Sequence, residues 1–177
     1  AGPLAVKAIA PGMTHKTEHG AVRLGLATPA AAQEAAAALH GSLTAAGFDV
    51  TGFLVQQMVA GGVELLVGAM SHETFGPIVV CGAGGVTAEL WGDVQVRLAP
   101  VARRTATEMV SSLRVAPLLR GWRGAPRAKP GAVEDVVRRM GFLVADRPEV
   151  AEAELNPLLA TAAGAVAVDL RVRVAAD

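Results

Sequence analysis

Residues 154–169 read ELNPLLATAAGAVAVD, two apolar runs joined by a short alanine and glycine segment. If Ala160 and Ala165 close a hairpin, Asn156 and Asp169 lie opposite each other on one face, about 5 Å apart at Cβ. An amide oxygen and a carboxylate in that arrangement suit one hard cation such as Mg²⁺, which takes few ligands from protein and the rest from water and phosphates. The same residues also fit a plainer structure, because Asn-Pro is common in turns and an aspartate can be an ordinary edge charge.

Glu154 extends the candidate cation site by one position. It lies two residues before Asn156, so strand geometry puts both side chains on the same face, and the same register sets Glu154 opposite Arg171. Glu154 then either adds a ligand or neutralises the arginine. In both cases the pattern points toward nucleotide chemistry, because Mg²⁺ held by few protein ligands usually accompanies substrate phosphates.

The composition excludes several kinds of partner. The 177 residues carry 16 basic and 16 acidic side chains, so no net field attracts nucleic acid or an anionic membrane. Aromatic residues make up only 3%, which leaves few platforms for stacking bases. One cysteine, Cys81, rules out an internal disulfide and fits a reducing compartment. Because the chain has no long apolar run and no signal peptide, we expect it to be cytoplasmic.

Hydrophobic periodicity and turn residues predict a mixture of strands and helices. Thr28 and Pro29 are typical of a helix start, and Gly47 is typical of a helix end. Predicted strands cover 4–9, 21–26, 52–59, 62–70, 78–81 and 93–98, predicted helices cover 29–46, 102–114 and 131–146, a loop covers 120–130, and strands close the chain. This order predicts an α+β fold with a lobe boundary near 56–62.

Lys7 is unusual because it places an ammonium inside the apolar strand AVKAI, residues 5–9. A buried lysine has to meet an anion, reach solvent or change its pKa. A phosphate would satisfy it. Alternatively, a half-exposed strand would let the long side chain extend to water.

The loop after that strand, residues 14–19, reads THKTEH and concentrates titratable side chains. A histidine can serve as an acid, a base or a phosphoryl acceptor, and Lys16 beside His15 would attract a phosphate. Two histidines four residues apart in a loop, without a third soft ligand nearby, make zinc a poor interpretation. Solvated loop residues are the alternative.

Residues 82–85 read GAGG and follow a short apolar strand. Their backbone N–H groups could line an anion-binding turn, although a tight turn alone also explains such glycines. The segment matches neither a dinucleotide fingerprint nor a Walker A loop, because Thr87 takes the last glycine's position and no Gly-Lys-Ser/Thr follows. Beyond it, Glu89, Asp93 and Arg97 either line a cleft or form a solvated edge.

Read in order, these segments resemble the ATP-grasp domain of ADP-forming acyl-CoA synthetases, which are relatives of the succinyl-CoA synthetase β chain. The resemblance runs from about Leu4 to Val174 and therefore covers essentially the entire chain. The segments that carry it are AVK at 5–7, HK at 15–16, VQQMV at 55–59, GVEL at 62–65, FGP at 75–77, GAGG at 82–85, RLAP at 97–100, LRGWRG at 119–124 and ELNPL at 154–158.

The resemblance implies an ATP-grasp fold of two α+β lobes, residues 1–57 and 58–177, clamped around ATP or ADP with Mg²⁺. Lys7 would contact the phosphates, the strand 56–59 would be the adenine hinge, and Glu64 would lie near the ribose. Asn156 and Asp169 would carry the magnesium. The nucleotide-binding residues implied in this way are Lys7, Gln57, Met58, Val59, Glu64, Gly84 and Gly85.

The resemblance also implies a catalytic role for His15 and a partner. A phosphohistidine formed elsewhere would pass its phosphoryl group to His15, which would deliver it to ADP. The implied partner is a CoA-binding domain or subunit that carries the first phosphohistidine, and a homo- or hetero-oligomer fits this arrangement. We therefore expect an NDP-forming acid–thiol ligase in the full-length context, with at most the nucleotide half-reaction in this chain.

Two departures from the family pattern bear on these expectations. Ala21 follows Gly20 where the family's loop has a pair of glycines, and the chain starts at the lysine strand, so we expect the small lobe to be incomplete at its N-terminus. ATP-grasp regions of this type also occur fused to acetyltransferase domains. The alternative function is therefore a non-catalytic regulatory or assembly module.

Overall fold

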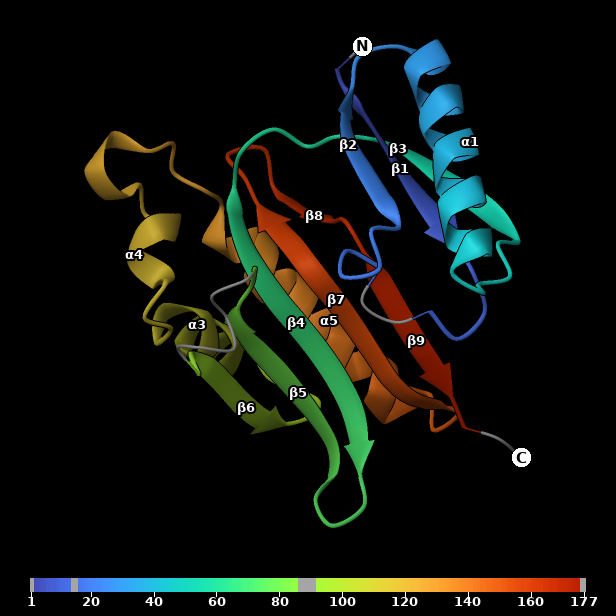
Figure 1. Cartoon of the computed structure of the whole chain (residues 1–177). Coiled ribbons are helices and arrows are strands. Elements are labelled where there is room, and N and C mark those ends of the chain that lie inside the picture. Colours follow the sequence, from blue (N-terminus) through green and yellow to red (C-terminus); the bar gives the residue numbers. More distant parts are fainter. Residues whose placement is uncertain (1, 14–15, 86–91, 176–177) are drawn as a thin grey trace. The chain divides into compact units, whose positions relative to one another are not determined.

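The computed structural model describes residues 2–13, 16–85 and 92–175 (Figure 1). The chain divides into two compact units, Ala1–Ala60 and Gly61–Asp177, which we call the N-terminal unit and the C-terminal unit. Each unit has an antiparallel sheet with helical cover on one face, so the predicted α+β class is confirmed. Among the described residues, no helix is long and apolar enough to cross a membrane.

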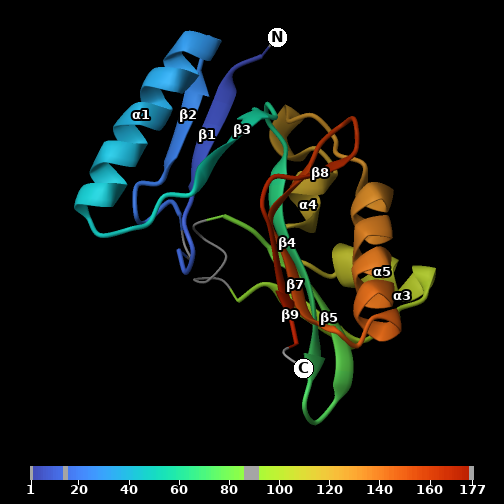
Figure 2. The same cartoon turned by 90° about the vertical axis from the view of Figure 1, so that its right-hand side faces the viewer.

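The N-terminal unit is a three-stranded sheet with one helix. Its elements are β1 (Leu4–Ile9), β2 (Val22–Leu26), α1 (Pro29–Ala45) and β3 (Gly52–Gln57), and the strand order is β2-β1-β3. Figure 2 shows α1 lying along one face of this sheet. The core forms there, because Val6 and Ala8 of β1 meet Leu39 and Leu43 of α1.

The start and end of α1 follow from its sequence. The hydroxyl of Thr28 accepts a hydrogen bond from the backbone N–H of Ala31 at 3.1 Å, which satisfies one donor of the first helical turn. Pro29 occupies the first helical position, where no N–H is needed. Gly47, with φ at +88°, takes the left-handed conformation that commonly follows a helix end. The predicted helix is therefore confirmed.

The C-terminal unit is a six-stranded sheet with helices on one face, as the side view in Figure 2 shows. The strand order is β6-β5-β4-β7-β8, and β9 also pairs with β7. The elements are β4 (Val63–His72), β5 (Gly76–Ala83), β6 (Val94–Leu98), α3 (Arg103–Ser111), α4 (Ala116–Leu119), the short 3-10 helix η1 (Trp122–Gly124), α5 (Pro130–Asp146), β7 (Val150–Ala160), β8 (Ala165–Ala167) and β9 (Leu170–Val174).

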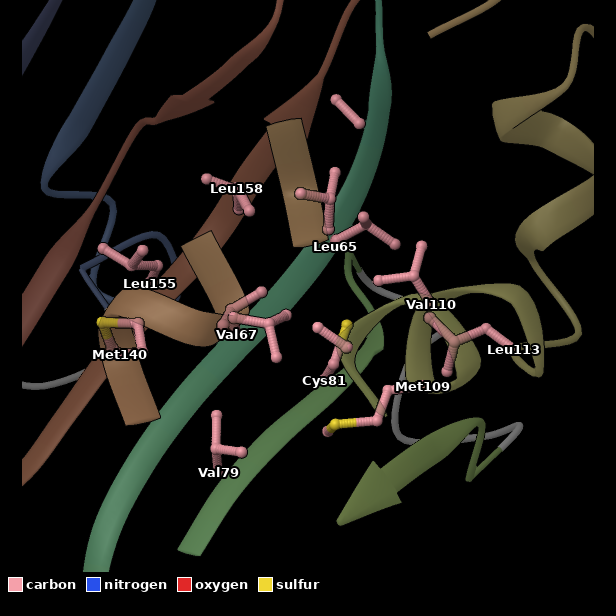
Figure 3. Packing of buried hydrophobic residues seen from close by; sticks show 14 of the residues in the cluster. Leu65, Val67, Val79, Cys81, Met109, Val110, Leu113, Met140, Leu155 and Leu158 are labelled. Atoms are coloured by element: carbon pink, nitrogen blue, oxygen red, sulfur yellow. The ribbon is translucent and has the colours of Figure 1, made fainter. Parts of the chain in front are cut away.

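Alternate residues of the central strands build the main core. Leu65 and Val67 of β4 and Cys81 of β5 point toward the helical side, where Met109 and Val110 of α3 meet them (Figure 3). Val133, Val137, Met140 and Val144 add the apolar stripe of α5. The other face of the sheet is therefore available to carry polar side chains.

A bulge in β7 adjusts this alternation next to the candidate cation site. Leu65 pairs with Leu158 and Val67 pairs with Leu155, so two residues of β7 face one residue of β4 between these pairs. The extra residue explains why Leu155 and Leu158, three positions apart, both enter the core. It also sets Asn156 within a strand.

One predicted helix is longer than the observed one. The sequence predicts a helix over 102–114, whereas α3 ends at Ser111. The backbone N–H groups of Arg114 and Val115 instead donate to the carboxylate of Asp93, at 2.8 and 2.9 Å. A side chain that is distant in sequence therefore competes successfully with the helical hydrogen bonds.

Candidate nucleotide and metal site

The ribbon formed by β7, β8 and β9 has the predicted register. Ala160 pairs with Ala165 around a turn in which the N–H of Thr161 donates to the carbonyl of Gly164 at 2.7 Å. Farther along, Glu154 pairs with Arg171. Both pairings confirm the register expected from residues 154–169. The turn is stabilised further by the Thr161 hydroxyl, which accepts from the N–H of Gly164 at 3.2 Å.

Asn156 and Asp169 are neighbours across this ribbon. The backbone N–H of Asn156 donates to the carbonyl of Asp169 at 3.2 Å, and the N–H of Val168 donates to the carbonyl of Pro157 at 3.0 Å. Asn156 and Pro157 lie inside β7, so the alternative interpretation of Asn-Pro as a turn is wrong. Asn156 is exposed and Asp169 is partly buried, which leaves the pair open to a ligand from solvent.

Glu154 fixes the orientation of the Asn156 side chain. The amide nitrogen Nδ2 of Asn156 donates to Oε1 of Glu154 at 3.1 Å. A carboxylate can only accept, so the amide must present its nitrogen to Glu154. The oxygen Oδ1 of Asn156 is then directed away from Glu154. Within the described ranges, no three His, Cys, Asp or Glu side chains cluster as a metal site. The candidate donors of the predicted site are this amide oxygen and the Asp169 carboxylate, and a ligand role for Glu154 stays a prediction.

Gly84 and Gly85, which we call the glycine turn, follow β5 directly and pack against β4. The N–H of Gly84 donates to the carbonyl of Glu64 at 2.9 Å. A side chain at Gly84 would lie 2.8 Å from backbone atoms of Glu64 and Leu65. Gly85 has φ at +77°, and a Cβ there would lie 2.5 Å from Oε2 of Glu64. Close packing and backbone conformation therefore require both glycines, and Glu64 lies beside the glycine turn.

Lys7 is buried in β1, with 6% of its surface exposed. Val22 and Leu54 are its partners on the neighbouring strands. Because Val6 and Ala8 face the helix α1, alternation puts Lys7 on the opposite face of the sheet. The low exposure contradicts the alternative of a lysine extending from a half-exposed strand into water.

The predicted adenine hinge lies at the open edge of β3. The N–H of Met58 donates to the carbonyl of Pro3 at 2.8 Å, which continues the pairing with β1. By alternation, the backbone groups of Gln57 and Val59 point away from β1. The N–H of Met58 is therefore already used. The Met58 sulfur in turn accepts from the N–H of Gly25 at 3.0 Å.

The loop with the predicted phosphoryl carrier is only partly described. His15 lies outside the described residues. In the described part that follows His15, the N–H of Ala21 donates to the carbonyl of Lys16 at 2.8 Å. Ala21 itself is buried in the core of the N-terminal unit.

Asp93 is a residue whose importance the sequence did not reveal. A cleft lining or a solvated edge was expected for it, together with Glu89, which lies outside the described residues, and Arg97. Instead, Asp93 is 5% exposed and accepts two backbone hydrogen bonds. Arg97 is exposed, and its guanidinium donates to the carbonyl of Val96 at 2.7 Å. A single acidic residue before a strand carries no sequence signal for such a long-range tether.

Comparisons with known proteins define the class to which this fold belongs. The family model described as an ATP-grasp domain matches residues 1–174. The chain therefore belongs to the ATP-grasp family, which confirms the predicted fold and family.

The most informative relatives are ADP-forming acetate–CoA ligases. The chain is 38% identical to ADP-forming acetate–CoA ligase I of Archaeoglobus fulgidus, over 96% of the chain and 25% of that protein. It is 31% identical to the beta subunit of the corresponding ligase I of Pyrococcus furiosus, over 96% of the chain and 74% of that subunit. The chain thus spans about a quarter of the first protein and about three quarters of the second.

Solved structures of a similar protein have the same fold. The dinucleotide forming acetyl-coenzyme A synthetase 1 of Ca. Korarchaeum cryptofilum, in complex with coenzyme A and Ca-AMPCP, matches with a TM-score of 0.91 and 31% identity, over 98% of this chain and 76% of that chain. A second structure of that synthetase contains coenzyme A and Mg-AMPPCP, with a phosphohistidine segment pointing towards the nucleotide binding site. It matches with a TM-score of 0.85, 31% identity and the same coverage.

Proposed function

We propose that this chain is the ATP-grasp part of an ADP-forming acyl-CoA synthetase and that it transfers a phosphoryl group between a phosphohistidine and ADP or ATP. The observation that carries the proposal is the pairing of Asn156 with Asp169 in the ribbon. It supports a site in which the amide of Asn156 and the carboxylate of Asp169 act together, in a chain whose relatives include ADP-forming acetate–CoA ligases.

The donor set fits magnesium. In this proposal, Oδ1 of Asn156 and the carboxylate of Asp169 bind Mg²⁺, and Glu154 orients the amide through its bond to Nδ2. These hard oxygen donors suit Mg²⁺, and the partial exposure of the pair leaves room for water and phosphate oxygens. When bound, Mg²⁺ would neutralise charge on the phosphates of the nucleotide.

The remaining predicted residues would bind the nucleotide itself. Lys7 contributes a buried ammonium group for phosphate oxygens. Its low exposure strengthens the electrostatic attraction, because little water screens the charge. The outward backbone groups of Gln57 and Val59 suit the edge of an adenine base. Glu64 and the glycine turn belong to the C-terminal unit, where Gly85 would offer its N–H group to the phosphates, because the N–H of Gly84 already donates to the carbonyl of Glu64.

The chemical step proposed for His15 is a balanced phosphoryl transfer. The P–N bond of a phosphorylated His15 breaks, and a P–O bond to the terminal phosphate of ADP forms. The imidazole nitrogen keeps the electron pair of the broken bond and is available as the acceptor in the reverse direction. Alignment and charge neutralisation are the main requirements of such a transfer.

The proposal includes a partner. A CoA-binding domain or subunit with its own phosphohistidine would supply the phosphoryl group, and it would carry the acyl-CoA chemistry. The phosphohistidine segment in the solved structure of the similar synthetase supports this part of the proposal. Assembly with such a subunit would make the active protein a hetero-oligomer or a longer polypeptide.

Labelling with γ-³²P-ATP tests the phosphoryl transfer. With magnesium present, the protein should acquire an acid-labile, base-stable label, and His15→Ala should abolish it. His19→Ala is the matched control from the same loop and should keep the label. Persistent histidine labelling in His15→Ala would contradict the assigned carrier.

Calorimetry separates catalysis from the alternative of a regulatory or assembly module. Magnesium-dependent ATP binding should be lost in Asp169→Ala and retained in Asp135→Ala, which removes an exposed carboxylate of α5. Absence of ATP binding in the wild-type protein would favour the assembly module.

A further inference from the structure

We propose that Asp93 is a positioning residue that sets how the glycine turn presents its backbone to nucleotide phosphates. The inference rests on the function proposed above. It adds a residue that the predicted site does not contain and that does not itself touch the nucleotide.

The side chain of Asp93 is hydrogen-bonded to the backbone of the helical layer. Its Oδ1 accepts from the N–H of Arg114 at 2.8 Å, and its Oδ2 accepts from the N–H of Val115 at 2.9 Å. These N–H groups lie in the turn between α3 and α4. A carboxylate that is 5% exposed would be costly without such partners, and charge-assisted bonds are among the stronger ones in proteins. Both oxygens are thus fixed in direction.

The backbone of Asp93 is hydrogen-bonded to the end of β5 and packs closely against it. Its carbonyl accepts from the N–H of Ala83, the residue before Gly84, at 2.9 Å. A side chain at Gly82 would lie 2.9 Å from the same carbonyl oxygen. The last residues before the glycine turn therefore have no freedom to move toward β6 while Asp93 is held by its carboxylate.

The glycine turn is fixed from two sides as a result. Glu64 of β4 holds Gly84 through a backbone bond of 2.9 Å, and Asp93 holds Ala83. Loss of one carboxylate bond would let residue 93 shift, and the turn would shift with it. Hydrogen bonds weaken steeply with distance and angle, so a small displacement of the turn would weaken contacts to phosphate oxygens.

A purely structural role makes a different prediction. General destabilisation would lower the binding of every ligand alike or of none. A positioning role would weaken phosphate contacts selectively, because the proposed hinge residues Gln57 and Val59 belong to the other unit. The ratio of the affinities for ATP and for adenosine therefore discriminates between the two roles.

The test compares Asp93→Asn with the wild-type chain. Mg-ATP binding is measured by calorimetry and adenosine binding by NMR titration, at a temperature at which far-UV circular dichroism shows both proteins folded. The dissociation constant for Mg-ATP should rise at least tenfold, and that for adenosine should change less than twofold. Asp135→Asn is the matched control, since it removes the same charge from an exposed site paired with Arg139 at 2.7 Å, and it should change neither value.

Val115→Pro provides a second variant if Asp93→Asn fails to fold. It removes one N–H donor to Asp93 but keeps the carboxylate, and Val115 has φ at −75°, which proline adopts. It should show the same selective loss of Mg-ATP affinity. Equal losses for both ligands, or no loss for either, in a folded variant would overturn the inference. Failure of the wild-type chain to bind Mg-ATP would instead contradict the proposed function.

Discussion

Asn156 and Asp169 are held together by backbone pairing within one ribbon, whereas Gly84 and Gly85 are held by contacts from β4 and from Asp93. The ribbon needs only a tight turn and a correct register, which lie within a single stretch of sequence. The glycine turn depends on residues that come from separate elements. The two regions therefore differ in how a mutation should act, because one tolerates side-chain changes and the other does not.

The largest expected effect is on the stability of the glycine turn. Gly84→Ala forces a Cβ to within 2.8 Å of the β4 backbone, which cannot move aside as a flexible side chain would. We expect a loss of about 3 kcal/mol in the free energy of unfolding, measured by urea denaturation. Gly131→Ala is the control, because a Cβ there meets nothing within 4 Å. A loss below about 0.5 kcal/mol in Gly84→Ala would show that the turn is not tightly packed.

The second prediction concerns Cys81, which lies on β5 shortly before the glycine turn. Burial, with a smaller contribution from the charge of Asp93, raises the pKa of its thiol from 9.0 to about 12. The folded protein thus keeps the proton longer than the unfolded chain, so the stabilisation is complete below pH 9 and is lost as the pH rises toward 12. Stability should fall by up to about 1.4 kcal/mol per pH unit in that window.

Cys81→Ala supplies the comparison for this pH dependence. Urea unfolding of the two proteins between pH 8 and 10.5 isolates the cysteine, because every other titrating group is shared. The decrease with pH should be smaller in Cys81→Ala. Parallel curves for the two proteins would contradict the assigned pKa of the thiol.

The ribbon should respond in the opposite way, with a change in binding and little change in stability. Asp169→Asn removes the charge but leaves the backbone bond between the carbonyl of residue 169 and Asn156 intact. We expect at least tenfold weaker magnesium-dependent ATP binding by calorimetry, with an unfolding free energy within about 1 kcal/mol of the wild-type value. Large destabilisation with unchanged binding would reverse the comparison.

The smallest effect distinguishes the two roles left open for Glu154. Glu154→Gln keeps an oxygen that accepts from Nδ2 of Asn156, so an orienting role predicts a change in magnesium affinity below about threefold. A direct ligand would cost tenfold or more. Glu152→Gln, which removes an ion pair with Arg173 at 3.3 Å, is the matched control from the same strand.

These differences also explain what the sequence alone could predict. The helix α1, the positions of strands along the chain and the register of the ribbon follow from local signals such as Thr28, Pro29 and a short turn. The bulge at Asn156 and the tether from Asp93 could not be predicted, because each depends on pairing with distant residues. Helix α3 shows the same limit, since Asp93 takes the N–H groups that a longer helix would have used.

The candidate site was predictable to a similar extent. Alternation located Lys7 within a buried strand and set Asn156 opposite Asp169. The sequence also singled out the glycines, but it could not decide between an anion-binding turn and close packing. Gly84 now has a packing reason of its own, so its presence alone is no longer an argument for phosphate binding.

Paramagnetic Mn²⁺ tests the central claim most directly. In the presence of ADP, a substoichiometric amount of Mn²⁺ should broaden the backbone NMR signals of Asn156 and Asp169 before those of other residues, and excess Mg²⁺ should restore them. If the signals of Asn156 and Asp169 stay sharp while other signals broaden, the cation does not bind at the ribbon and the account is contradicted.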